Sequence, residues 1–170
     1  MQLFVLNVMV VSLLLAAQPS HAQSEKPSYG IRDPDPPTGS GIRREVVKGA
    51  VLPINKRYAE LTAEEKATLN RYYERVDPGD EPPFPAEGLR PIYEAMRKGQ
   101  NKLGVTGELI LLATVAVDGE VIEVKSLGSP SEEMTKFAAS VLFFTKFQPA
   151  VCGGKPCQMQ FPFAYSFSRW

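Results

Sequence analysis

Two runs of alternating apolar residues, joined by Asp118 and Gly119, constrain this chain more than any other feature. The segment 107–127 reads GELILLATVAVDGEVIEVKSL, and an Asp-Gly pair between such runs is typical of a tight β-hairpin turn. With these two residues as the loop, Val117 lies opposite Glu120, and one face of the hairpin is apolar. That face carries Leu109, Leu111, Ala113, Val115, Ile122 and Val124. We therefore expect a sheet with one buried face.

The opposite face of the hairpin is mixed in character. Its polar members are Glu108, Thr114, Glu123 and Lys125. Ile110 and Leu112 add an apolar patch at the end far from the turn. An apolar patch of this kind needs a cover, and we expect either the segment Ile42–Ile54 or a partner protein to provide it.

Three segments are predicted as helices. The first, Leu61–Val76, begins with a capping box made by Thr62 and Glu65. Its apolar residues recur at helical spacing and are Leu69, Tyr72, Tyr73 and Val76. The proline-rich stretch EPPFPAEG, residues 81–88, follows as an extended connector.

The second predicted helix is Pro91–Leu103, with its proline in the first turn. The third is Ser129–Phe147, with Ser129 as the N-cap. Its predicted inner stripe consists of Met134, Phe137, Ala138, Val141 and Phe144 or Thr145. Together these patterns predict an α+β fold, in which helices pack on one face of a small antiparallel sheet made by the hairpin and a C-terminal edge strand.

The last strand is predicted over Gln158–Ser168, where every odd position is Met, Phe or Tyr. Because proline has no N–H, Pro162 places this strand at an edge of the sheet. The even-numbered residues, which include Pro162, then direct their backbone groups to the free edge, where a partner could add a strand by β-augmentation. Pro162 is equally suited to guard the edge against such pairing. The candidate partner-binding residues are Gln158, Gln160, Pro162, Ala164, Ser166 and Ser168.

The two cysteines, Cys152 and Cys157, lie just before this strand. A Cys pair without a second pair or a histidine cannot close a zinc site, and the redox spacing would be C-x-x-C. In an exported protein an even pair is most simply a disulfide. We expect Cys152–Cys157 to be a structural disulfide that sets where the last strand begins.

The N-terminus predicts export. Residues 4–17 form an almost unbroken apolar run, which is short for a bilayer span, and Ser20-His21-Ala22 follows it. This pattern is typical of a signal peptide cleaved after Ala22. The alternative is an uncleaved anchor in the inner membrane. Residues 23–60 are expected to form a tether rich in Pro and Gly together with a strap. After cleavage we expect a periplasmic protein without a membrane span.

The composition argues against several classes of function. Nineteen basic and nineteen acidic residues cancel, so nothing indicates a nucleic-acid surface. His21, the one histidine, leaves with the signal peptide, which excludes His-dependent triads and metal sites. Asp77, Asp80 and Glu81 cluster in a loop but read as a helix stop. We therefore expect no enzyme activity and no cofactor.

The second half of the chain resembles the C-terminal domain of the TonB family of energy transducers. The resemblance rests on the order helix, hairpin, helix, strand, on the motif V..DG.V..V, and on F.PA...G.P before a strand of alternating aromatics. The matching residues are Gly107, Asp118, Gly119, Val121, Phe147, Pro149, Ala150, Gly154 and Pro156. It implies a small α+β domain over residues 91–170, preceded by an accessory helix and connector over 61–90, whose last strand recruits outer-membrane receptors by strand addition.

The chain also departs from that family. Energy transducers need a membrane anchor and a long proline-rich spacer, whereas this N-terminus looks cleavable and the tether is short. We therefore expect an exported interaction module that binds an outer-membrane receptor or another envelope protein, with a role in transport at the outer membrane as the narrower reading. The alternative is a structural or self-associating domain, such as a homodimer, with no transport role.

Overall fold

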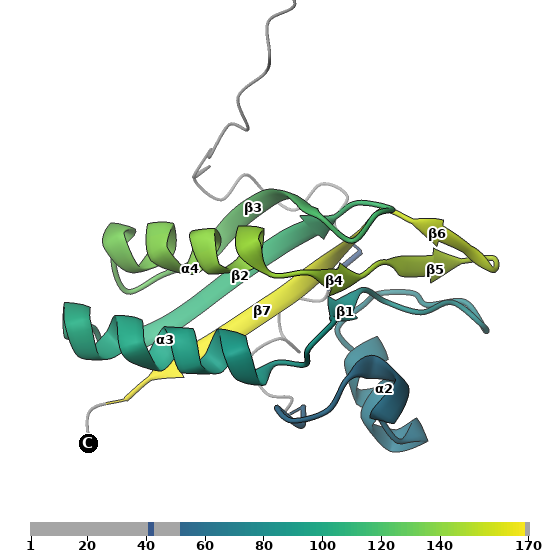
Figure 1. Cartoon of the computed structure of the whole chain (residues 1–170), viewed down its shortest axis with the longest axis horizontal. Coiled ribbons are helices and arrows are strands. Elements are labelled where there is room, and N and C mark those ends of the chain that lie inside the picture. Colours follow the sequence, from purple (N-terminus) through teal and green to yellow (C-terminus); the bar gives the residue numbers. More distant parts are fainter. Residues whose placement is uncertain (1–40, 43–51, 169–170) are drawn as a thin grey trace, which may run out of the picture.

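The centre of the molecule is a three-stranded antiparallel sheet (Figure 1). The computed structural model describes residues 41–42 and 52–168; the predicted signal peptide and most of the tether lie outside these residues. The strands follow the order β3-β2-β7 and are β2 (Gly107–Val115), β3 (Val121–Gly128) and β7 (Met159–Phe167).

Two helices lie side by side over one face of this sheet (Figure 1). They are α3 (Arg90–Leu103) and α4 (Glu132–Phe144). The ring of Phe137 in α4 packs so closely on Gly99 in α3 that a Cβ at Gly99 would come within 2.6 Å of it. The predicted α+β class, with helices on one face of a small antiparallel sheet, is confirmed.

The hairpin differs from the prediction at its turn. The N–H of Ala116 donates to the carbonyl of Glu120 at 2.8 Å, so the loop between them has three residues instead of two. Val115 consequently pairs with Val121, next to an irregularity in the register. Ile122, which was predicted in the core, is 51 % exposed. The prediction for Ile122 is wrong because this longer loop shifts the start of β3 by one residue.

Helix α4 corrects two further predictions. Its N-cap is Ser131, whose hydroxyl accepts from the N–H of Met134 at 3.1 Å; the predicted N-cap, Ser129, instead donates to the carbonyl of Ser131. At the other end Leu142 is fully buried, whereas Phe144 is 87 % exposed. The buried residues Met134, Ala138 and Leu142 recur every four positions. This spacing leaves Phe144 outside the inner stripe.

The turn of the hairpin is held against a segment that follows α4. The N–H of Phe147 donates to the carbonyl of Gly119 at 3.1 Å, and the ammonium of Lys146 pairs with the carboxylate of Glu120. Gly119 has a φ of +82°, and a Cβ there would lie 2.1 Å from the carbonyl oxygen of Phe147. The Asp-Gly motif and the FQPA motif, far apart in the sequence, therefore meet in space.

The proline-rich connector forms a strand that the sequence did not predict. β1 (Phe84–Pro85) pairs with β4 (Phe147–Gln148). Glu81 continues the same antiparallel register, since its backbone exchanges two hydrogen bonds with Val151 at 2.8 and 2.9 Å. Beyond β4 the chain forms a small hairpin of β5 (Ala150–Cys152) and β6 (Lys155–Cys157).

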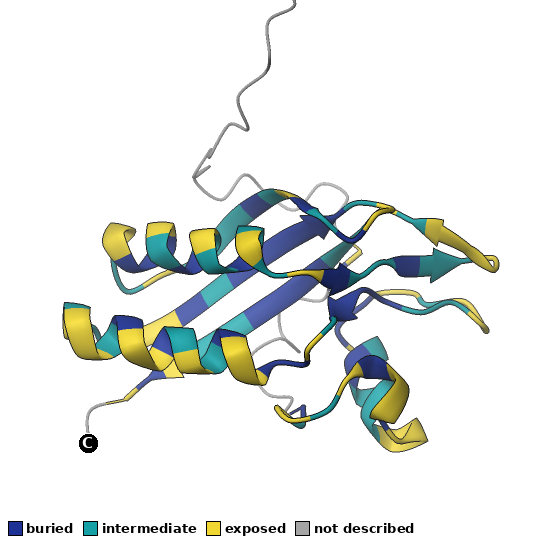
Figure 2. Ribbon diagram, in the orientation of Figure 1, coloured by how far each residue is buried: buried dark blue, intermediate teal, exposed yellow. Residues whose placement is uncertain are grey.

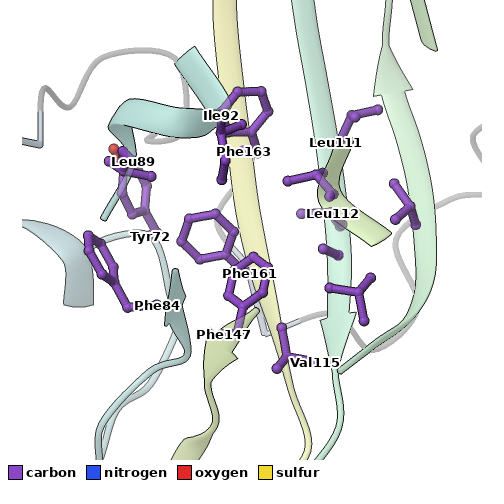
Figure 3. Close-up of a cluster of buried hydrophobic side chains, with 14 of the residues drawn as sticks. Tyr72, Phe84, Leu89, Ile92, Leu111, Leu112, Val115, Phe147, Phe161 and Phe163 are labelled. Atoms are coloured by element: carbon purple, nitrogen blue, oxygen red, sulfur yellow. The ribbon is translucent and has the colours of Figure 1, made fainter. Parts of the chain in front are cut away.

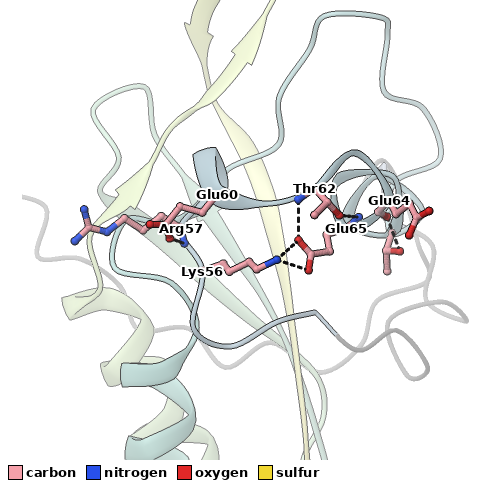
Figure 4. A network of polar contacts seen from close by, with 7 residues as sticks. Lys56, Arg57, Glu60, Thr62, Glu64 and Glu65 are labelled. Carbon is pink, nitrogen blue, oxygen red and sulfur yellow. Dashed lines mark hydrogen bonds and ion pairs between the residues drawn. The ribbon is translucent and has the colours of Figure 1, made fainter.

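Helix α2 (Ala63–Asn70) is shorter than the predicted Leu61–Val76. Its predicted capping box is present, and the carboxylate of Glu65 also binds the ammonium of Lys56 at 2.7 and 2.9 Å (Figure 4). A 3-10 turn, η1 (Tyr58–Glu60), precedes it. The helix stops early because Tyr73 forms a bridge with Ile42 in place of another helical turn.

One hydrophobic core joins the sheet to residues 52–89 (Figure 2). Phe161 of β7 is at its centre, with the ring of Phe147 at 5.2 Å and the ring of Phe84 at 6.2 Å (Figure 3). Tyr58 extends this row by its contact with Phe84, also at 6.2 Å. The end of the predicted tether and the accessory helix thus pack into the same core as the C-terminal segment.

The face of the sheet opposite the helices is partly buried too. Leu112 and Thr114, which point to that face, are 3 % and 7 % exposed. Ile42, where the predicted covering segment begins, and Leu52, near its end, are both buried, whereas Ile54 at its end is 39 % exposed. Residues 43–51 of that segment lie outside the described residues.

Candidate functional site

The candidate site is the free edge of β7. This strand pairs with β2 along its whole length, from Gly107 opposite Phe167 to Val115 opposite Met159, and no other strand of the described residues pairs with it. Even-numbered residues direct their backbone groups away from β2. The carbonyls of Gln160 and Ser168 demonstrate this orientation, since they accept hydrogen bonds from side chains outside the sheet.

The half of this edge that is nearer the hairpin turn is closed by the chain itself. The hydroxyl of Tyr73 donates to the carbonyl of Gln160 at 2.9 Å. Burial raises the pKa of Tyr73 strongly, so its hydroxyl keeps the proton that this bond needs. Pro162, the next residue that faces the edge, is buried and offers no N–H.

A small hollow lies against β7 from Phe161 to Ala164, where the closed half meets the rest of the edge. Its volume is about 30 Å³, which is room for roughly one water molecule. It lies between β7 and residues of the preceding segments, which include Leu52, Tyr72, Leu89 and Tyr93. Burial also raises the pKa of Tyr72, to about 12. The hollow is too small for an organic ligand.

The other half of the edge is accessible. Ala164 is half-buried, and Ser166 and Ser168 are exposed. Among the described residues, none hydrogen-bonds the edge-facing backbone groups of Ala164 and Ser166. The opening ends at Ser168, whose carbonyl accepts from the side-chain amide of Gln100 at 2.8 Å.

A larger groove lies on the sheet face opposite the helices, beside the start of β7. Its volume is about 440 Å³, and Gln158, which precedes β7, lies on its wall. The charged groups on its wall are already paired: Lys125 with Glu123 at 3.4 Å, and Arg75 with Asp77 at 2.8 Å. The groove is therefore polar and internally neutralised, unlike the mainly apolar pockets that hold small molecules.

The two cysteines form the predicted disulfide, with their Cα atoms 5.8 Å apart. The bond joins β5 to β6 across a turn in which Gly153 and Gly154 both have positive φ. The N–H of Gly153 donates to the carboxylate of Asp80 at 2.8 Å, so the hairpin is also attached to the connector. Only Gln158 separates β6 from β7, and the disulfide therefore fixes the chain directly before the edge strand.

Of the six predicted edge residues, the structure groups Gln160 and Pro162 in the closed half and Ala164, Ser166 and Ser168 in the accessible half. Gln158 lies outside the strand. Sequence reasoning missed Tyr73 and Gln100, which delimit the accessible half. No local pattern could reveal them, because each acts through a contact with a residue at least 68 positions away.

The described residues contain no group of three or more Asp, Glu, His or Cys side chains that could hold a metal ion. Within the same residues, no helix has the length and apolar character needed to cross a membrane. No family model matches the chain, and no curated protein matches it at a significant level. The likeness to TonB C-terminal domains thus rests on the quoted motifs alone.

Proposed function

We propose that this chain is an exported protein-interaction module without enzyme activity, which binds an extended segment of an envelope protein along the edge of β7. The observation that carries this proposal is an edge strand of nine residues that is fully paired on one side and accessible at Ala164 and Ser166 on the other. Unpaired strand edges bind extended peptides through main-chain hydrogen bonds.

Several features support a rigid, exported domain. The disulfide between Cys152 and Cys157 suits an oxidising compartment, and an apolar run followed by Ser20-His21-Ala22 is typical of a signal peptide. Phe161 and its aromatic neighbours anchor β7 in the core, so the strand already has its extended conformation before a partner binds. An outer-membrane receptor is the partner that the TonB likeness suggests, and transport across the outer membrane is the narrower function.

Photo-crosslinking in intact cells tests this proposal. A photoreactive amino acid at Ser166, which is exposed on the edge, should form an adduct with an envelope protein that mass spectrometry then identifies. The same probe at Glu133, exposed on α4, should not form it. Equal adducts from both positions, or none from Ser166, would contradict the proposal.

The second candidate is a structural domain that associates with itself. It is favoured by Phe144, which is 87 % exposed and offers an apolar contact to a second copy, while Pro162 limits how far two copies pair through the edge. Under this reading Pro162→Thr raises oligomerisation, measured by sedimentation velocity, and the adduct from Ser166 contains a second copy of the chain.

A further inference from the structure

The edge of β7 is divided into two unequal parts by contacts within the chain. Tyr73 occupies the carbonyl of Gln160, and Pro162 supplies no donor. Gln100 occupies the carbonyl of Ser168 and also approaches the carbonyl of Val105 at 3.4 Å. Between these two limits lie the backbone groups of Ala164 and Ser166, which we call the edge window.

The window fixes the length of any paired segment. In an antiparallel ladder a hydrogen-bonded residue exchanges two bonds with the residue opposite, and the next such residue lies two positions away. Ala164 and Ser166 therefore accommodate a partner core of roughly three residues. A longer strand would meet Tyr73 at one end and Gln100 at the other.

Helix α3 places a positive charge beside the window. Tyr93 packs edge-to-face on Phe163 and Tyr165 at 5.8 and 5.2 Å, and Gln100 reaches Ser168, so both residues lie on the side of α3 that borders the edge. Arg97 is four positions after Tyr93 and three before Gln100, and such spacing puts it on the same side of the helix.

Arg97 is also available for a ligand. It is exposed, and no ion pair joins it to another residue of the described part of the chain. Lys98, its neighbour, is equally exposed but is rotated by about 100° around the helix, away from the side of Tyr93 and Gln100. A guanidinium at a strand edge favours a carboxylate, which it can bind through two parallel hydrogen bonds.

We propose that the edge window binds a short extended peptide segment that pairs with Ala164 and Ser166 and carries an acidic residue for Arg97. This inference rests on the proposed function and specifies its register and the charge of its partner. Tyr73 and Pro162 act as a stop that prevents pairing along the remaining edge. Selectivity then comes from one charged contact and a small number of main-chain bonds.

The backbone of β7 offers a matched pair of variants. Ala164→Pro removes an N–H that points away from β2, so the pairing within the sheet is kept, as it is at Pro162. Pro162→Val does the reverse and restores an N–H in the closed half. Ala164→Val, which keeps the N–H, controls for added bulk. Circular dichroism and thermal unfolding first establish that each variant is folded.

The probe is a phage-displayed library of random linear decapeptides, selected on the purified, oxidised chain. The affinities of the selected peptides are then measured for every variant. We expect Ala164→Pro to weaken them roughly tenfold, whereas Pro162→Val should not weaken them. We also expect acidic residues to be enriched, Arg97→Glu to weaken binding by a similar factor, and Lys98→Glu to have no effect.

The outcomes separate the inference from the proposed function. Peptides that bind more tightly to Pro162→Val and ignore Ala164→Pro would overturn the window while leaving strand addition at the edge intact. Peptides that respond to neither variant bind elsewhere and contradict the proposed function, as does a selection that yields no binder. Equal effects of Arg97→Glu and Lys98→Glu would overturn the specific role of Arg97.

Discussion

The two ends of β7 have the same alternating pattern but different surroundings. At the end near the hairpin turn, Phe161 is 2 % exposed and contacts Phe84 and Phe147, and Tyr73 closes the edge. At the C-terminal end, Tyr165 is half-buried, and the next residue, Ser166, is exposed. The difference shows that contacts with distant segments, and not the alternating pattern, decide which part of an edge strand stays accessible.

The largest expected effect sharpens this comparison within the core. Phe161→Ala should destabilise the fold by about 3–5 kcal/mol, because a large side chain is lost from a fully packed position. Tyr165→Ala, at the other end of the same strand, should cost clearly less since its side chain is half-buried. Urea unfolding followed by circular dichroism measures both, and equal costs would contradict the proposed asymmetry.

A glycine substitution tests the contact between the hairpin turn and β4. Gly119→Ala should cost more than about 2 kcal/mol, since it adds a clash with Phe147 to an unfavourable positive φ. Gly104→Ala, at the C-terminus of α3, is the control: its φ is +64° and a Cβ would have open space around it. It should cost about 1 kcal/mol, and a cost as large as that of Gly119→Ala would argue against the clash.

Removal of the disulfide should have an intermediate effect. The double variant Cys152→Ser, Cys157→Ser should lose about 2 kcal/mol or less, because the closed loop is short and the contacts of Glu81 and Asp80 still hold the hairpin. Thermal unfolding of this variant and of the reduced native chain should agree. Peptide binding at the window should persist, since the disulfide is at the opposite end of β7.

The smallest expected effect concerns how residues 52–89 are attached. The ammonium of Lys56 lowers the pKa of Glu65, with a further contribution from the N–H of Thr62. Because the folded pKa lies below the unfolded one, the ionised carboxylate stabilises the fold above the unfolded pKa, and this stabilisation is lost as the pH falls through the folded pKa.

Glu65→Gln should therefore reduce stability slightly at neutral pH and make no difference in acid below the pKa of Glu65. Glu64→Gln, one position earlier on the same helix, is the control and should leave the free energy of unfolding unchanged at both pH values. Chemical unfolding at several pH values measures this, and a difference that persists in acid would exclude the ion pair as its cause.

Much of the local structure could be predicted because its signals are local. Helix α3 begins within one residue of the predicted start and ends at Leu103 as predicted, with a proline in its first turn and a glycine after its last residue. The alternation in β7 and the spacing of the cysteines were equally direct. Predictions failed where backbone pairing with a distant segment replaced a local preference, as at Tyr73, whose apolar spacing suggested more helix.

The sequence by itself determined the α+β class, the edge position of β7 and the disulfide, because periodicity, a proline without an N–H and an even cysteine pair act over a few residues. Only the tertiary structure decided that Tyr73 closes one half of the edge and that Gln100 limits the other. It also placed Tyr93 and Gln100 of α3 against β7. These features depend on how distant segments dock on one core, and no short stretch of sequence encodes that arrangement.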